Sequence, residues 1–134
     1  MENLLELEIV SPEKKVFSGK VQSVSAPGIL GEFQVLYNHA ALVSTLDTGR
    51  IKVMNENNIE EIFATGGGVL EVKENKVSIL AESIESKKEI NVERAQKALT
   101  NAELALKDAK SSIEKEEIYN SKRRAQNRIR IAQK

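Results

Sequence analysis

The residues with the clearest chemical capability are cations gathered in the last part of the chain. Residues 115–134 carry seven Lys or Arg against two Glu, a net charge of +5, while residues 1–114 carry 13 basic and 18 acidic side chains. A basic segment on an acidic body favours attraction to carboxylates or phosphates of a partner. The simpler interpretation is a solvated helix face whose cations suit a helix C-terminus.

In contrast, the sequence shows no set of residues suited to catalysis or to metal binding. The chain has no Cys and a single histidine, His39, so it offers neither a thiol nucleophile nor a Cys/His metal cluster. Gly28 and Gly31 lack the lysine and the following helix of a phosphate-binding loop. The triple glycine 66–68 fits a β-bulge better than an anion nest. We therefore predict a non-enzymatic protein with no catalytic residues and no metal.

Composition bounds the class of protein. The chain has 134 residues, no Cys and 30% charged residues, and it contains no apolar run near the roughly 20 residues that span a bilayer. Its first ten residues show no basic segment followed by an apolar run, so we predict no signal peptide. These features predict a soluble cytoplasmic protein without direct membrane insertion.

The elements that must position the cations and the histidine are of two unlike kinds. All seven glycines and both prolines lie within the first 68 residues. In this front part Leu5, Leu7 and Ile9 alternate with glutamates, which is typical of a half-buried strand. Further strands are predicted at 50–54, 60–65, 69–73 and 76–81, with Glu74-Asn75 as a two-residue hairpin turn. Short strands with no helix between them predict an antiparallel β-sandwich or barrel.

The back part, free of glycine and proline, has the period of helices. Alanines repeat every seven residues, as at 95, 102 and 109, and form a stripe with Leu99, Leu106 and Ile113 on a helix from about Val92 to Lys110. Asn91 is the predicted N-cap, and Ser111-Ser112 the predicted turn. A second stripe contains Ile118, Ala125, Ile129 and Ala132. We predict an antiparallel two-helix hairpin over 86–134, following a β-domain over 1–85; because alanine buries little area, it should be marginally stable.

Four blocks of the sequence resemble one family. They are GILGEFQVLYNHAALVSTLDTG (28–49), GGGVLEV (66–72), VSILAE (77–82) and INVERA (90–95). Their order and spacing resemble the epsilon subunit of F-type ATP synthases over nearly the whole chain. The resemblance implies the same two-part architecture, and a non-catalytic rotor subunit of the central stalk that links the gamma subunit to the c-ring. It also implies a peripheral location at the cytoplasmic face of the cell membrane, within the ATP synthase complex.

The resemblance also assigns interface residues on the β-domain. Gly31 and Glu32 match the loop that meets the c-ring, and His39 matches the position that faces the gamma subunit; a hydrogen-bonded structural histidine is the alternative. The chain departs from the family pattern at Gln34 and at Tyr37-Asn38, where Gly and Pro-Gly are common. The sequence leaves the geometry of this turn open.

The helical hairpin matches the family's regulatory element, which inhibits ATP hydrolysis when it extends into the catalytic alpha/beta hexamer. The cations implied to contact the catalytic subunits are Lys122, Arg123, Arg124, Arg128 and Arg130. Some bacterial members bind ATP on the folded hairpin, and the matching positions are Glu85, Ile90, Asn91, Arg94, Arg124 and Arg128. Because Asn91 replaces an aspartate of that motif, we predict absent or weak regulatory ATP binding and no required cofactor.

The competing interpretation is a nucleic-acid-binding adaptor, in which the basic helix binds the phosphates of the nucleic acid. It is weakened because Tyr119 is the only aromatic residue near the cations and the rest of the chain is acidic. A small β-sandwich enzyme would need a clustered acid, base and nucleophile, which the sequence does not show. We therefore predict no nucleic acid among the partners.

Overall fold

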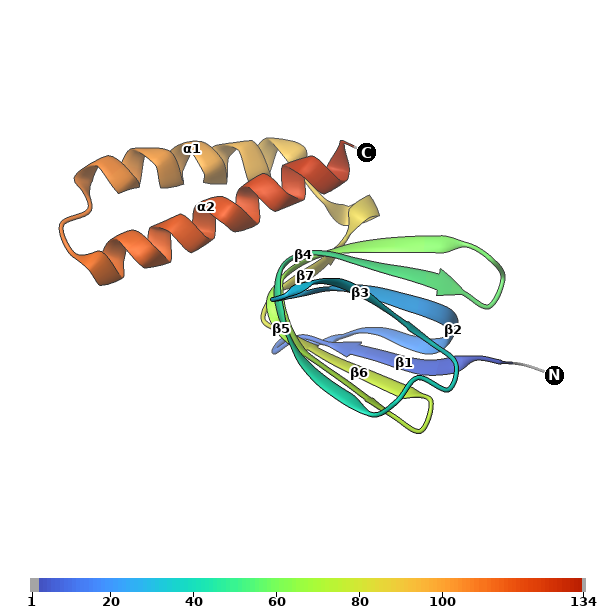
Figure 1. The fold of residues 1–134 in the computed structure, drawn as a ribbon. Helices are drawn as coiled ribbons and strands as arrows, with labels where there is room; N and C mark the ends of the chain where they lie inside the picture. Colours follow the sequence, from blue (N-terminus) through green and yellow to red (C-terminus); the bar gives the residue numbers. More distant parts are fainter. Residues whose placement is uncertain (1–2, 134) are drawn as a thin grey trace. The chain divides into compact units, whose positions relative to one another are not determined.

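The computed structural model describes residues 3–133, which form a series of β-strands followed by helices (Figure 1). It divides into two compact units between Ser86 and Lys87. The first unit holds every strand, and the second holds a short 3-10 helix and two α-helices. The predicted fold class, an antiparallel β-domain followed by a two-helix hairpin, is confirmed.

The β-unit is a nearly closed ring of strands. Its strands are β1 (Leu5–Val10), β2 (Lys15–Gly28), β3 (Gly31–Leu36), β4 (Leu42–Asn55), β5 (Glu60–Lys73), β6 (Lys76–Ala81) and β7 (Ile84–Ser86). They pair in the order β1-β6-β5-β4-β2-β3, and β1 also pairs with β2, which closes the ring. All pairings are antiparallel except that of β1 with β6. Closure removes most free sheet edges, so β3 is left as a flanking strand on β2.

The interior of the ring is the hydrophobic core. Leu5, Leu7 and Ile9 point inward from β1 while Glu6 and Glu8 are exposed, as the alternation predicts. Each long strand contributes further aliphatic side chains, and Phe17 and Phe63 meet edge to face with ring centroids 6.3 Å apart. Val, Ile and Leu thus make up most of the core, and Phe63 is buried among them.

The triple glycine joins two predicted strands into one. The segments 60–65 and 69–73, predicted as separate strands, both belong to β5, which continues through Gly66, Gly67 and Gly68. There β5 changes partner, from β6 at Gly68 to β7 at Thr65. The buried Thr65 hydroxyl lies 3.1 Å from the carbonyl oxygens of both Gly67 and Ser83 and accepts from the Gly67 N–H. Glycine is needed because Gly67 and Gly68 take positive φ values of 113° and 154°.

The hairpin turn between β5 and β6 is confirmed as Glu74-Asn75. Both residues are left-handed, with φ values of 51° and 62°, as a type I′ turn requires at its two central positions. The polar loop between β4 and β5 is stabilised differently: the Asn55 side chain accepts from the N–H groups of Asn57 and Ile59. These turns fix the register of the long strands.

The second unit contains η1 (Lys87–Glu89), α1 (Val92–Asp108) and α2 (Ser112–Ala132). The Asn91 side chain accepts from the Arg94 N–H at 3.0 Å, which confirms it as the N-cap of α1. Helix α1 ends two residues earlier than predicted. The prediction of a turn at both serines was wrong for Ser112, because Ser111 caps α2 by accepting from the Glu114 N–H and Ser112 begins the helix.

The two helices pack as an antiparallel hairpin through small side chains. Ala95, Ala102 and Ala125 are buried, so the helices approach closely but remove little apolar area from water. The first predicted stripe extends too far, since Ile113 belongs to α2 and is 73% exposed. The second predicted stripe misses Asn127 and Ile131, which are buried on α2. Helix α2 contacts η1 as well as α1.

Candidate functional site

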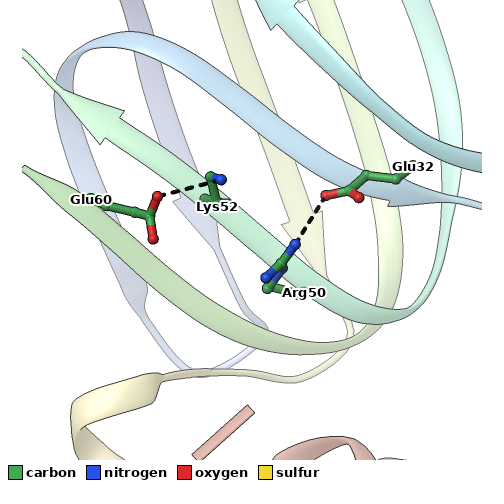
Figure 2. Close-up of polar contacts among 4 residues, drawn as sticks. All are labelled: Glu32, Arg50, Lys52 and Glu60. Carbon is green, nitrogen blue, oxygen red and sulfur yellow. Dashed lines mark ion pairs between the residues drawn. The ribbon is translucent and has the colours of Figure 1, made fainter. Parts of the chain in front are cut away.

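The turn between β2 and β3 presents the two residues assigned to the c-ring interface. Gly28 pairs with Gly31, so Ile29 and Leu30 form a two-residue turn, and Gly31 takes a φ of 134° that favours glycine. Glu32 is the second residue of β3, and its Oε1 lies 3.7 Å from Nη2 of Arg50 on β4 (Figure 2). The Glu32 side chain is 53% exposed and that of Arg50 is 37% exposed, so this ion pair is solvated, contributes little stability and leaves Glu32 accessible.

Apolar side chains form an exposed row across the outer face of the ring. Val10 pairs with Leu80, Leu80 with Val69 and Val69 with Thr45, and the Ile29 N–H donates to the Thr45 carbonyl. Leu80 is 63% exposed, and Ile29 and Val69 are exposed as well. We call the residues Val10, Leu80, Val69, Thr45 and Ile29 the apolar row. Because such patches on soluble domains mark docking surfaces, the apolar row is a candidate interface.

The β2–β3 turn extends the apolar row at one end. Leu30 at the turn is fully exposed, and Val43 at the start of β4 is 68% exposed. Both line one shallow hollow together with Glu32 and Phe33. The row and the turn residues therefore form a continuous apolar surface beside one carboxylate.

His39 lies in the connection between β3 and β4. Its backbone N–H donates to the Leu36 carbonyl at 3.1 Å, and its ring Nδ1 lies 2.7 Å from the Ala40 carbonyl oxygen. Because a carbonyl oxygen only accepts, Nδ1 carries the proton of this bond, and Nε2 is the nitrogen that can serve a partner. The preceding Asn38 adopts a φ of 66°, which answers the question left open by the missing glycine: asparagine tolerates the left-handed conformation.

The structure separates the two sets of assigned interface residues on the β-unit. Glu32 is the second residue of β3 and His39 lies beyond its end, so most of this six-residue strand, on the order of 15 Å, separates them. This spacing suits two partners rather than one pocket. The apolar row was not predictable from the sequence, because its residues come from five separate segments that only strand pairing brings together.

The cations of the hairpin lie along the second half of α2. Arg124 donates through Nη2 to the Ser121 hydroxyl at 3.0 Å, Arg130 is exposed, and Lys122, Arg123 and Arg128 are half-buried. Residues 87–134 carry 13 basic and 7 acidic side chains, a net charge of +6, whereas residues 1–86 carry 7 and 13, a net charge of −6. The charge asymmetry of the sequence thus coincides with the division into units.

The residues assigned to ATP fall on both units. Glu85 belongs to β7 of the β-unit, whereas Ile90, Asn91 and Arg94 surround the start of α1. Arg124 and Arg128 belong to α2, whose C-terminal end lies at the same end of the hairpin as the start of α1. The Asn91 side-chain oxygen already accepts from the Arg94 N–H, so it is committed to capping.

Two other kinds of feature are absent from residues 3–133: a metal-binding cluster and a helix suited to span a membrane. No group of three or more His, Cys, Asp or Glu in this range could hold a metal ion. None of the helices in the same range is long and apolar enough to cross a membrane.

Comparison with known families accounts for both units. Residues 4–87 match the model of the ATP synthase delta/epsilon chain β-sandwich domain, and residues 88–133 match that of the delta/epsilon chain long α-helix domain. These matches give no support to the nucleic-acid-binding alternative.

Individual proteins agree with the family models. The ATP synthase epsilon chain of Nitratidesulfovibrio vulgaris (strain DP4) is 39% identical over 131 residues, covering 98% of this chain and 97% of that protein. The epsilon chain of Carboxydothermus hydrogenoformans is 46% identical over 102 residues, covering 76% of this chain and 75% of the relative.

Solved structures share the fold at lower identity. A chain of the Euglena gracilis mitochondrial ATP synthase (OSCP/F1/c-ring) superposes with a TM-score of 0.81 at 19% identity, covering 95% of this chain and 80% of that one. A chain from the central stalk and c-ring of the Tetrahymena thermophila enzyme gives 0.71 at 16% identity, with 96% of each chain covered. From its two domains and its bacterial relatives, the chain belongs to the family of ATP synthase epsilon chains.

Proposed function

We propose that this chain is a non-catalytic rotor subunit of the central stalk, which links the gamma subunit to the c-ring and so couples ion translocation to ATP synthesis. Family membership supports this proposal. So does the fold shared with a chain from a structure named for the central stalk and c-ring. In this role the protein is peripheral, at the cytoplasmic face of the cell membrane, and needs no cofactor.

The observation that carries the proposal is the apolar row. Leu80, Val69 and Ile29 are exposed along one row. In the free domain their apolar surface stays in contact with water, so it contributes no hydrophobic stabilisation. A partner that covers the row recovers that free energy. We assign this surface to the gamma subunit together with His39, since Val43 at its border follows His39 by four residues.

The c-ring contact is assigned to the β2–β3 turn. Leu30 and Glu32 protrude there next to each other, and Gly31 has open space around the position of a Cβ. An apolar residue beside a carboxylate can pack and accept hydrogen bonds at the same time. Gly31 and Glu32 therefore complete a second contact at the end of the apolar row, and most of strand β3 separates it from His39.

The first prediction tests the gamma assignment. Leu80→Glu should weaken binding to epsilon-depleted F1 by at least about tenfold, roughly 1.4 kcal/mol, because it buries a charge in the apolar interface. Since Leu80 is mostly exposed, thermal stability of the free protein should change little. Titration calorimetry gives the affinity. Ile59→Glu is the matched control, because Ile59 is similarly exposed but lies at the β4–β5 loop. Equal affinities of the two variants would contradict the assignment.

We propose further that the hairpin inhibits ATP hydrolysis by reaching the catalytic alpha/beta hexamer in an extended state. Two features support it: the alanine seam gives the hairpin little packing free energy, and the net charge of +6 attracts carboxylates. The element thus has two states of similar free energy, and a partner can shift their populations.

For the nucleotide we propose at most weak binding of ATP at Ile90, Asn91, Arg94, Arg124 and Arg128, with Glu85. The neutral Asn91 side chain lacks the charge that strengthens a hydrogen bond about twofold. Millimolar ATP should therefore raise the thermal midpoint little, which corresponds to a Kd well above about 10 μM.

The second prediction follows from this proposal. Asn91→Asp should tighten ATP binding by roughly tenfold, since it restores a carboxylate while retaining the cap on α1. Asn91→Ser is the matched control, because serine caps the helix without adding charge. Calorimetric titration with ATP measures both variants. A Kd below about 10 μM for the unaltered chain would show that the carboxylate is dispensable.

A further inference from the structure

Two turns that are far apart in the sequence hold each other through their side chains. The Asn38 N–H donates to Oδ1 of Asn75 at 2.6 Å, and Nδ2 of Asn75 donates to Oδ1 of Asn38 at 3.2 Å. Asn38 belongs to the connection between β3 and β4, and Asn75 to the β5–β6 turn. We call this pair of hydrogen bonds the asparagine clasp.

The clasp depends on backbone conformations that asparagine tolerates. Asn38 and Asn75 are both left-handed, with φ values of 66° and 62°, a region that side chains other than Asn and Asp rarely enter. In this conformation the Asn38 N–H points toward Oδ1 of Asn75. A glycine at position 38 would allow the same backbone but could not accept the second bond.

The two ends of the clasp are anchored unequally. The Asn75 carbonyl accepts from the Glu6 N–H at 2.9 Å, which ties the β5–β6 turn to β1. Glu74 and Asn75 also connect paired strands directly, because Lys73 pairs with Lys76. The β3–β4 connection is held locally by the His39 N–H bond to Leu36. Asn75 is therefore the better anchored residue of the pair, and its hydrogen bonds restrain the segment that contains Asn38 and His39.

We propose that Asn75 is a positioning residue for His39: through the clasp it fixes the β3–β4 connection so that the His39 ring keeps Nδ1 on the Ala40 carbonyl and presents Nε2 to the partner. This inference rests on the proposed function, in which His39 faces the gamma subunit. It assigns a role to a turn residue that lies 37 positions from Asn38 along the chain.

The test replaces the side chain without disturbing the turn. Asn75→Gly keeps the left-handed backbone and removes both clasp bonds, whereas Glu74→Gly alters the neighbouring left-handed residue and leaves the clasp intact. Asn75→Asp retains the acceptor for the Asn38 N–H and loses the donor of the second bond, so it should keep part of the clasp. Because His39 is the only histidine, its ring resonances in a proton NMR spectrum report on its setting without ambiguity.

We expect Asn75→Gly to shift or broaden the His39 ring resonances. It should also weaken binding to epsilon-depleted F1 about fivefold, which is the effect of losing one hydrogen bond between His39 and the partner. Glu74→Gly should stay close to the unaltered chain in both measurements, and Asn75→Asp should fall between the unaltered chain and Asn75→Gly. Unchanged His39 resonances in Asn75→Gly would overturn the inference. Shifted resonances with unchanged affinity would uphold the positioning of His39 by Asn75 and contradict only the proposed contact of His39 with gamma.

Discussion

Reversing the charge of Arg123, Arg124 and Arg128 to glutamate should raise ATP hydrolysis by the assembled ATP synthase severalfold and leave synthesis largely intact. In the proposed inhibitory state these cations gain charge-assisted contacts with carboxylates, each contributing on the order of 1 kcal/mol. Losing three of them shifts the balance between the two hairpin states by about 3 kcal/mol, roughly a hundredfold change in their ratio. Deleting residues 115–134 should have the same effect. The steady-state rate of ATP hydrolysis at low salt is measured for complexes that carry the unaltered chain, the triple variant or the deletion.

A matched control separates the cluster from net charge. Lys97, Lys107 and Lys110 are exposed on α1 and the loop after it, so their reversal to glutamate changes the total charge equally. This control should still inhibit. High salt should relieve inhibition in the unaltered chain more than in the Arg variant, because salt screens exposed charges. Equal hydrolysis by complexes with the unaltered and truncated chains at low salt would show that the hairpin does not inhibit hydrolysis in this protein.

Gly68→Ala should destabilise the β-unit by about 3 kcal/mol or more, lowering its thermal midpoint by more than about 10 °C. A Cβ at Gly68 would overlap the Leu80 carbonyl oxygen and lie 2.9 Å from the Ala81 Cα. Both obstacles are backbone atoms of the paired strand β6, so relief requires that strand to move. The positive φ of 154° adds strain of its own.

Two other glycines serve as controls for this substitution. Gly31 has a φ of 134° but open space around the position of a Cβ, so Gly31→Ala isolates the backbone strain and should cost roughly 1–2 kcal/mol. At Gly19 a Cβ would make ordinary contact with the Phe17 ring, so Gly19→Ala should change stability by less than about 0.5 kcal/mol. Urea unfolding followed by circular dichroism ranks the three. A Gly68→Ala protein as stable as Gly19→Ala would refute this account of Gly68.

Local patterns were sufficient for much of the fold. The alternation of Leu5, Leu7 and Ile9 predicted β1, and Glu74-Asn75 predicted a turn, because strand pleat and turn chemistry act over neighbouring residues. Asn91 was likewise recognisable as a cap from its place before the first alanine of the stripe.

Features that depend on long-range packing were not predictable in this way. The continuation of β5 through three glycines depends on β6 and β7 pairing with its two halves. The burial of Asn127 follows from packing around α2 that the alanine repeat does not encode. The interface is harder still, since the apolar row and the asparagine clasp exist only after distant strands and turns have come together.

The most direct test of the central claim is to add the full chain to membrane vesicles that contain epsilon-depleted ATP synthase and to follow ATP-driven ion pumping with a gradient-sensitive dye. If the chain links gamma to the c-ring, pumping should return to the level of the intact enzyme, and the Leu80→Glu protein should require at least about tenfold more protein for the same recovery. Vesicles that bind the chain but do not regain pumping would contradict the proposed coupling role.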